Sequence, residues 1–136
     1  MSINHVGIAA PPAKYDAVVA FYTSALGPLN YTAILSFPDG VGMGPADTKV
    51  PDFWIGQKDA ASAQQESHVA FLAKDEAAVR AFHAAALSAD AGGRDNGAPG
   101  IRAQYRPTYY AAFVLDPLGN NIEAFYDPVE HERKGA

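Results

Sequence analysis

The chain contains an internal repeat, and this feature restricts its possible folds more than any other. The segment Ile3 to Ile8 reads Ile-Asn-His-Val-Gly-Ile and has a counterpart in Ser67 to Phe71, which reads Ser-His-Val-Ala-Phe. His5 and His68 correspond at an offset of 63 residues, and a helical sequence follows each of them at a similar distance. Because self-similarity at a fixed period marks a duplicated structural unit, we expect two copies of roughly 60 residues.

Each copy has the same predicted order of secondary structure. In the first copy, apolar residues at helical spacing predict a helix from Tyr15 to Leu26, and Gly27-Pro28 ends it. In the second copy, Asp75 is a candidate N-cap for the matching helix. Three strands follow each helix, and the last of them are Asp52 to Gly56 and Asn121 to Tyr126. The pattern is βαβββ twice, which predicts an α+β fold.

Length and composition predict a single domain. With 136 residues and 49% hydrophobic content, the chain falls in the commonest size range for a domain and can build a sizeable core. We expect this domain to cover residues 1–127, with the first module at about 2–60 and the second at about 65–127. Residues 128–136 should form a polar C-terminal tail.

Composition also excludes several functional classes. The chain has no cysteine, so any bound metal must be held by nitrogen and oxygen ligands. Its formal net charge of -5 argues against nucleic acid as a partner, because such binding needs a basic surface. It has no basic leader and no apolar run of about 20 residues, so we expect a cytoplasmic protein with no membrane partner. The expected partner is a small molecule.

Strand alternation puts three candidate metal ligands on one side of the predicted sheets. Successive side chains of a strand point to opposite faces, so the apolar neighbours of His5, His68 and Glu123 face away from them. The apolar faces should pack under the helices. The three polar side chains should therefore share the helix-free side, where a half-buried carboxylate without a partner is costly.

The order of these motifs resembles that of the vicinal oxygen chelate superfamily. The resemblance rests on the duplication, on the segments Asn4 to Ile8 and Ser67 to Phe71, and on the closing sequence Asp116 to Glu123, and it covers about residues 2–127. The superfamily includes glyoxalase I, extradiol dioxygenases, fosfomycin-resistance transferases, methylmalonyl-CoA epimerase and bleomycin-binding proteins. The resemblance implies two βαβββ modules that form a U-shaped cup, the glyoxalase/bleomycin resistance/dioxygenase fold.

The same resemblance implies a divalent metal ion in the cup, held by His5, His68 and Glu123. The fourth family position lies in the last strand of the first module, and register against Glu123 puts it at or near Trp54, which cannot bind a metal. Asp52 and Gln57 are close enough that a shift of one or two residues would restore an oxygen ligand. Otherwise two histidines and one carboxylate remain, a set that suits Zn(II), Ni(II), Fe(II) or Mn(II) with open positions for substrate.

Other candidate site residues are expected mainly in the second module. Tyr109 and Tyr110 are candidate catalytic proton donors, and alternation allows only one of them to enter the cup. The candidate substrate-binding residues are Trp54, Arg102, Tyr105 and Phe125. Trp54 would serve as an apolar or stacking wall if it faces the cup.

A locally basic segment precedes these tyrosines in the second module. It contains Arg94, Arg102 and Arg106, whose forked hydrogen bonds suit a substrate carboxylate or phosphate, although surface arginines often bind nothing. Within it, Asp95-Asn96-Gly97 predicts a turn.

Three functional hypotheses follow. The preferred one is a divalent-metal-dependent lyase or isomerase of the glyoxalase kind, acting on a small substrate that chelates the metal through adjacent oxygens. An extradiol-type dioxygenase is less favoured, because such enzymes more often carry a tandem pair of these domains. The alternative from another class is a metal-free binding protein of the bleomycin-resistance kind. The resemblance also implies a homodimer, in which the cup closes within one chain or between two chains.

Overall fold

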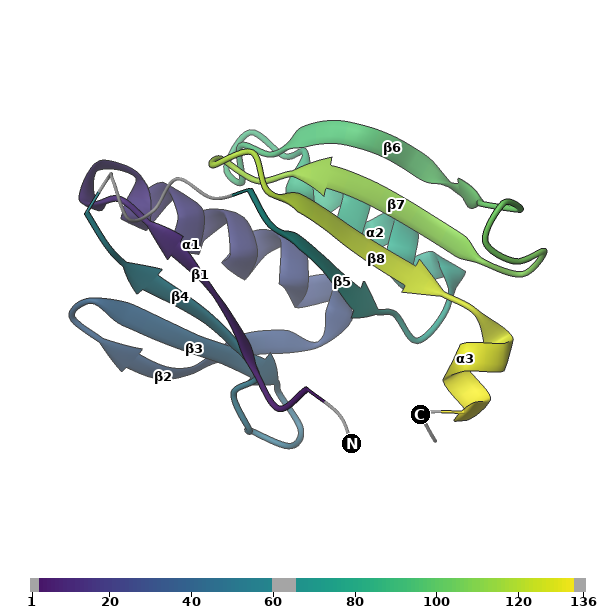
Figure 1. Ribbon diagram of the computed structural model, residues 1–136, viewed down its shortest axis with the longest axis horizontal. Coiled ribbons are helices and arrows are strands. Elements are labelled where there is room, and N and C mark those ends of the chain that lie inside the picture. The colour runs from purple at the N-terminus through teal and green to yellow at the C-terminus, as the bar shows by residue number, and fades with distance from the viewer. Residues whose placement is uncertain (1–2, 60–65, 134–136) are drawn as a thin grey trace.

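The computed structural model describes residues 3–59 and 66–133, which form two four-stranded sheets and the helices beside them (Figure 1). Sheet 1 has the order β1-β4-β3-β2, with β1 Val6–Ala10, β2 Tyr31–Phe37, β3 Gly40–Pro45 and β4 Phe53–Gln57. Sheet 2 has the order β5-β8-β7-β6, with β5 His68–Leu72, β6 Arg94–Ile101, β7 Tyr110–Leu115 and β8 Asn121–Tyr126. In both sheets the first strand runs parallel to the last, and the other pairs are antiparallel. The predicted βαβββ duplication is confirmed.

One long helix follows the first strand of each module. These helices are α1, Pro12–Leu26, and α2, Glu76–Ala86; the 3₁₀ turn η1, Gly27–Leu29, follows α1, and α3, Pro128–Arg133, follows β8. The first helix begins three residues before the predicted Tyr15, because proline is well suited to the first helical turn, where its missing N–H has no partner to lose. The predicted cap of α2 is confirmed, since the Asp75 carboxylate accepts a hydrogen bond from the Ala78 N–H at 2.8 Å.

The hydrophobic core joins the two modules on the helix side of both sheets. Helices α1 and α2 contact each other, and aromatic rings continue the contact between the sheets. Tyr22 of α1 lies 4.9 Å from Phe53 of β4, which lies 5.3 Å from Phe71 of β5, measured between ring centroids. The Tyr22 hydroxyl donates a 2.5 Å hydrogen bond to the buried Asp116 carboxylate of the second module. The predicted junction at about 60–65 lies outside the described residues.

The burial pattern of the strands gives each sheet a helix face and an open face. Ile8, Phe53 and Ile55 are buried against the helices in sheet 1, as are Phe71 and Ile122 in sheet 2. The alternate residues, including the predicted ligands His68 and Glu123, belong to the open face. Alternation therefore positions the candidate site, and the shared core holds both sheets in place behind it.

The predicted turn at Asp95-Asn96-Gly97 is wrong, because these residues lie inside β6. The pairing of β6 with β7 shifts register between Asp95 and Gly97, and Gly97 has φ of 156°, so the chain bulges here instead of reversing. The Asp95 side chain still accepts a hydrogen bond from the Gly97 N–H at 3.1 Å, which is the local bond that the turn motif predicts. Among the described helices, none is both long and apolar enough to span a membrane.

Candidate active site on the open face of the second sheet

The site is centred on Glu123, which is in the middle of β8 and only 3% exposed. His68 comes from the start of β5, the strand that pairs with β8, and its Nε2 lies 3.2 Å from Glu123 Oε1. Tyr109 precedes β7, the other neighbour of β8, and its hydroxyl donates a 2.5 Å hydrogen bond to Glu123 Oε2. Each carboxylate oxygen therefore has a partner from a different strand, and the three side chains form one cluster.

The His68 ring is oriented by a backbone contact. Its Nδ1 lies 2.9 Å from the carbonyl oxygen of Asn121, which can only accept a hydrogen bond, so Nδ1 carries the proton. Its Nε2 is then the nitrogen that faces Glu123. A carbonyl behind Nδ1 is the usual arrangement that fixes the tautomer and direction of a metal-binding histidine.

The Tyr109 ring is held on both faces. It stacks on Phe125 with a centroid distance of 4.8 Å and an interplanar angle of 4°, and the Arg106 guanidinium lies 5.8 Å from its centroid. Burial, followed by the hydrogen bond to Glu123, raises the pKa of the Tyr109 phenol above its ordinary value. Tyr109 is therefore a neutral hydrogen-bond donor to Glu123 at physiological pH.

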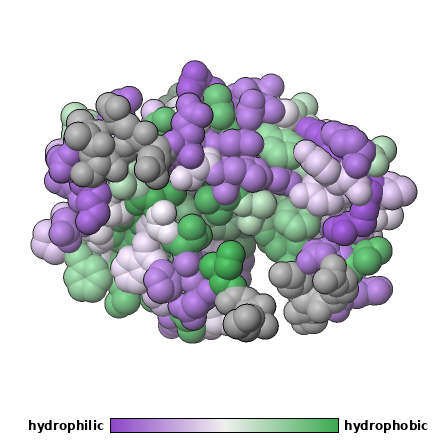
Figure 2. Space-filling model, viewed as in Figure 1, coloured by the Kyte–Doolittle hydropathy of each residue, from purple (hydrophilic) through white to green (hydrophobic). Residues whose placement is uncertain are grey.

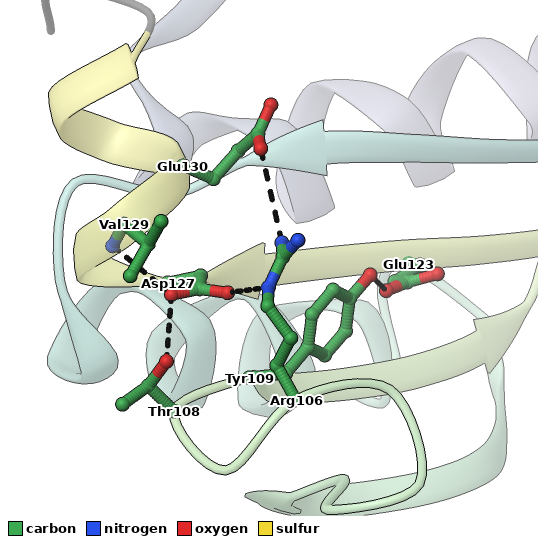
Figure 3. A network of polar contacts seen from close by, with 7 residues as sticks. All are labelled: Arg106, Thr108, Tyr109, Glu123, Asp127, Val129 and Glu130. Carbon is green, nitrogen blue, oxygen red and sulfur yellow. Dashed lines mark hydrogen bonds and ion pairs between the residues drawn. The ribbon is translucent and has the colours of Figure 1, made fainter.

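Asp127 anchors the segment that carries Tyr109 (Figure 3). It is fully buried, and it accepts hydrogen bonds from Arg106 Nε, from the Thr108 hydroxyl at 2.8 Å and from the Val129 N–H at 3.0 Å. Arg106 also lies 3.7 Å from Glu130 of α3. The end of β8 and the start of α3 therefore fix the loop before β7, and with it the direction of the phenol.

A small pocket of about 320 Å³ opens beside these groups. It is lined by His68, Tyr105, Arg106, Tyr109 and Glu123. Tyr105 is 59% exposed and packs edge-on against Tyr109 at 5.1 Å. Tyr105 therefore lies at the rim of this pocket, and its contact with a substrate stays a prediction. Phe125, the other predicted aromatic residue, supports Tyr109 from below.

His5 does not belong to this cluster within one chain. It is exposed at the start of sheet 1, and its Nδ1 lies 2.7 Å from the side-chain oxygen of the neighbouring Asn4. Within residues 3–59 and 66–133, no three histidine, aspartate or glutamate side chains lie close enough together to hold one metal ion. The structure thus brings together two of the three predicted ligands.

The strand registers make Trp54 the counterpart of Glu123 in the first module. In sheet 1 Trp54 pairs with Gly7, whereas in sheet 2 Glu123 pairs with Ala70, and Gly7 and Ala70 are separated by the offset of the two histidines. Trp54 therefore occupies the equivalent position in the first module, as the sequence predicts. Its ring stacks on Phe37 at 6.4 Å and covers Gly42, where an added Cβ would lie 2.7 Å from the indole.

Two predicted site residues lie elsewhere. Tyr110 points to the helix face, where it packs against the core and its hydroxyl accepts a 3.3 Å hydrogen bond from Arg80 of α2. Arg102 donates to the carbonyls of Gly100 at 2.9 Å and Ala98 at 2.7 Å, and its guanidinium stacks over Phe113. Tyr110 lies on the helix face, so the geometry gives it no place beside Glu123. Arg102 lies over Phe113, the cross-strand neighbour of Glu123, but the carbonyls of Gly100 and Ala98 already accept hydrogen bonds from its guanidinium.

Sequence reasoning missed Asp127 and Phe113. Asp127 directly follows the strand of Glu123, and its place at the end of an apolar strand was the usable signal in the sequence. The structure shows that it is buried there. Phe113 pairs with Glu123 across β7 and β8, and its ring stacks on His68 at 6.4 Å. The alternation of side chains along the two strands was the signal that could have placed Phe113 beside Glu123.

Solved structures with this fold include proteins of the glyoxalase type. A glyoxalase/bleomycin resistance protein from Albidiferax ferrireducens T118 is 24% identical, with 90% of this chain and 97% of that chain covered and a TM-score of 0.67. A glyoxalase/bleomycin resistance protein/dioxygenase family enzyme from Burkholderia phytofirmans PsJN is 20% identical, with coverage of 93% and 99% and a TM-score of 0.68. Lactoylglutathione lyase from Agrobacterium tumefaciens is 20% identical, with coverage of 89% and 91% and a TM-score of 0.57.

No protein-family model matches the sequence, and no curated protein sequence matches it either. At identities of 24% and below, the structural likeness speaks for the fold. Both modules take part in it, because the matches cover nearly all of each chain. The chain therefore has the vicinal oxygen chelate fold of the glyoxalase/bleomycin resistance/dioxygenase proteins.

Proposed function

We propose that the protein is a divalent-metal-dependent lyase or isomerase acting on a small substrate that binds through adjacent oxygens. The observation that carries this proposal is the pair His68 Nε2 and Glu123 Oε1, 3.2 Å apart on the open face of sheet 2. Two ligand atoms that each bind a metal at about 2.1 Å lie roughly 3.0 to 3.4 Å apart in octahedral or tetrahedral geometry. The likeness to a solved lactoylglutathione lyase favours lyase chemistry within the fold.

The donor set suits a hard or borderline cation, because one imidazole nitrogen and one carboxylate leave several positions for oxygen ligands. His68 and Glu123 would hold the ion. When bound, it would act as a Lewis acid that stabilises negative charge on a substrate oxygen.

Tyr109 is the hydrogen-bond donor of the proposed site. Its hydroxyl is bonded to Glu123 Oε2 and lines the same small pocket as His68. A phenol with a raised pKa keeps its proton in the resting protein, so it can stabilise negative charge on a substrate oxygen in the pocket by donating a hydrogen bond. Arg106, over the ring, adds positive charge beside the same pocket.

His5 completes the proposed site from a second copy of the chain. Within one chain it is exposed and directly precedes β1, the edge strand of the other sheet. Strands β1 and β5 each pair with a single neighbour among the described strands, so each has a free edge that a second chain can approach. In a symmetric dimer, His5 of each chain would lie beside His68 and Glu123 of the other chain, which gives two equivalent sites.

Elemental analysis of protein purified without added metal tests whether the protein binds a divalent ion. We expect close to one divalent ion per chain in the parent, and loss of the ion in His68→Ala, Glu123→Gln and His5→Ala. His83→Ala is the matched control, because this histidine pairs with the exposed Asp95 and lies apart from the site. A parent without metal, even after incubation with Zn(II), Ni(II), Fe(II) and Mn(II), would reject the proposal.

Subunit mixing tests the shared site. If His5 and Glu123 meet across a dimer, refolding His5→Ala with Glu123→Gln gives mixed dimers in which one of the two sites is intact. Random pairing would then restore about a quarter of the parent's metal capacity, although neither variant binds metal alone. No recovery from dimers that do mix would place the three ligands in separate sites.

The activity assay follows the metal. A lyase or isomerase should turn over glutathione hemithioacetals or related substrates with adjacent oxygens, and oxygen uptake with catechols would indicate the dioxygenase alternative instead. The metal-free binding alternative is favoured by one observation, the stacked pair Phe37 and Trp54, since Phe37 is 56% exposed. A metal-free protein that binds planar ligands through these rings would support it.

A further inference from the structure

A second and larger cleft lies away from Glu123. It has a volume of about 1000 Å³. Its lining includes the segment that leads into β1, the first residues of β2 and β4, η1 and all of β5. It shares only His68 with the small pocket. Figure 2 shows hydrophobic surface in the middle of the same face, with hydrophilic residues around much of it. A volume of this size is at the upper end of the range of small-molecule sites.

Asp52 gives this cleft an unsatisfied charge. Its Oδ2 accepts a 2.9 Å hydrogen bond from the Tyr31 hydroxyl. Its Oδ1 is buried and has no hydrogen-bond partner, and it is the single such side-chain atom among the described residues. Buried carboxylate oxygens are rarely left without a donor, because they lose their bonds to water. Asp52 therefore lacks one donor or one cation.

The carboxylate can offer either oxygen to a ligand. The χ2 torsion of aspartate is broad, so a partial turn of the carboxylate at little cost can bring the buried oxygen towards the cleft. Tyr31 can keep its bond to one oxygen while the other takes a donor from the cleft. Apart from its two histidines, the lining has two further ionisable side chains, Asp47 and Lys74.

Next to Asp52 the cleft has an aromatic wall. Tyr31 lies edge-on to Phe71 at 5.3 Å, and Phe71 lies edge-on to Phe53 at 5.3 Å. Leu29 and Val69 extend the apolar surface. The wall therefore suits a ring or a compact apolar body beside the carboxylate.

Asp52 and His68 occupy different parts of the cleft. The Asp52 carbonyl accepts from the Val6 N–H at 2.9 Å, so Asp52 lies at the start of β1. His68 is at the start of β5, and Figure 1 shows that β1 and β5 run in opposite directions. A ligand at Asp52 therefore leaves the cluster of His68 and Glu123 free.

We propose that Asp52 and the wall of Tyr31, Phe53 and Phe71 bind a small organic cation, a protonated amine carried on an aromatic or apolar body. The amine donates to the unpartnered Asp52 oxygen, and the apolar body covers the three rings. This site uses neither the metal nor Glu123, although the proposed ligands His5 and His68 also line the cleft.

Benzylamine tests the proposal, because it is a ring that carries a protonated amine at neutral pH. In a two-dimensional NMR titration it should shift the amide signals around Tyr31, Phe53 and Phe71. Asp52→Asn keeps the acceptor for Tyr31 and removes the charge, so the dissociation constant should rise roughly ten- to hundredfold, the usual range for a hydrogen bond to a charged group. Benzyl alcohol should bind the parent about as weakly as benzylamine binds this variant.

Asp47→Asn is the matched control, since it removes the other acidic side chain of the lining, whose Oδ1 already has donors in Asn30 and Thr48. It should change the dissociation constant by less than about threefold, as expected for an exposed charge. Equal binding of benzylamine to the parent and to Asp52→Asn would overturn the proposal. So would an absence of shifts around the wall.

A second variant decides the matter if Asp52→Asn fails to fold. Tyr31→Phe keeps the ring and leaves both Asp52 oxygens without a protein donor, so benzylamine should bind more tightly, whereas weaker binding would count against the site. Analytical ultracentrifugation at the NMR concentration tests whether a second copy of the chain occupies the cleft instead. A dimer that closes the cleft and excludes benzylamine would assign this surface to a second copy of the chain.

Discussion

The two modules share one backbone plan and differ in what their open faces carry. At the equivalent position of the last strand, the first module has Trp54 over Gly42, and the second has Glu123 between His68 and Tyr109. Past the strand end, the first has the exposed Lys58 and the second the buried Asp127. The comparison teaches that the duplicated scaffold sets where a side chain points, while the residue at that position decides between an aromatic surface and a polar site.

Equivalent core residues of the two modules should contribute equally to the free energy of unfolding. Phe21 and Phe82 are counterparts on α1 and α2, and both are fully buried. Phe21→Ala and Phe82→Ala should each lower the free energy of unfolding by about 3 to 5 kcal/mol, because each leaves a cavity the size of a ring. Urea denaturation measures both values. Phe37→Ala, at a 56% exposed position, is the control and should cost far less. A large difference between the two core variants would break the equivalence.

The residues that follow the last strand of each module should differ in how much they contribute to stability. The buried Asp127 accepts bonds from Arg106, Thr108 and Val129, so Asp127→Asn should cost about 1.5 to 3 kcal/mol near neutral pH. Lys58→Met, at the exposed counterpart, should stay within about 0.5 kcal/mol.

The cost of Asp127→Asn should depend on pH. Burial alone would raise the pKa of Asp127, but the bonds from Thr108, Arg106 and Val129 outweigh it and lower the pKa below its ordinary value of 3.8. A lowered pKa in the folded state stabilises the fold above pH 3.8, and this contribution disappears as the pH falls below that value. Urea midpoints of parent and variant should therefore converge in acid. A gap that persists at low pH would assign the effect to packing.

The sequence predicted the relations that depend on local periodicity. His68 and Glu123 meet because their strands are direct neighbours and both side chains lie on the face opposite to apolar residues. The counterpart position of Trp54 followed from the repeat for the same reason. The fold followed too, because the duplication restricts the order of strands in both sheets.

The other relations depend on how distant elements pack. The position of His5 depends on the arrangement of two sheets that share no hydrogen-bonded strand pair, and the alternation in β1 carries no information about it. Arg102 looked like an anion site by charge, but the bulge in β6 places backbone carbonyls within its reach. The choice between Tyr109 and Tyr110 depended on the register of β7 beside α2, which one residue of shift would reverse.

The indole surface of the first module should depend on Gly42. A Cβ at this position would lie 2.7 Å from the Trp54 ring, so Gly42→Ala should force the indole to move and cost about 1 to 2 kcal/mol. Combined with Trp54→Ala, the same change should cost less than it does alone, because the obstacle is gone. A double-mutant cycle in urea measures this coupling. Additive costs would mean that the indole does not rest on Gly42.

The smallest effect is expected at Tyr110, and it tests the difference between the two faces of β7. Tyr110→Phe removes only a 3.3 Å bond from Arg80, whose side chain is largely exposed, so stability should change by less than about 1 kcal/mol. Because Tyr110 lies on the helix face, this change should also leave metal affinity unaltered. Tyr109→Phe, one residue earlier, should alter metal affinity, because it frees Glu123 Oε2. Isothermal titration with Zn(II) compares the two variants. An equal effect of both would contradict the assignment of Tyr109 alone to the site.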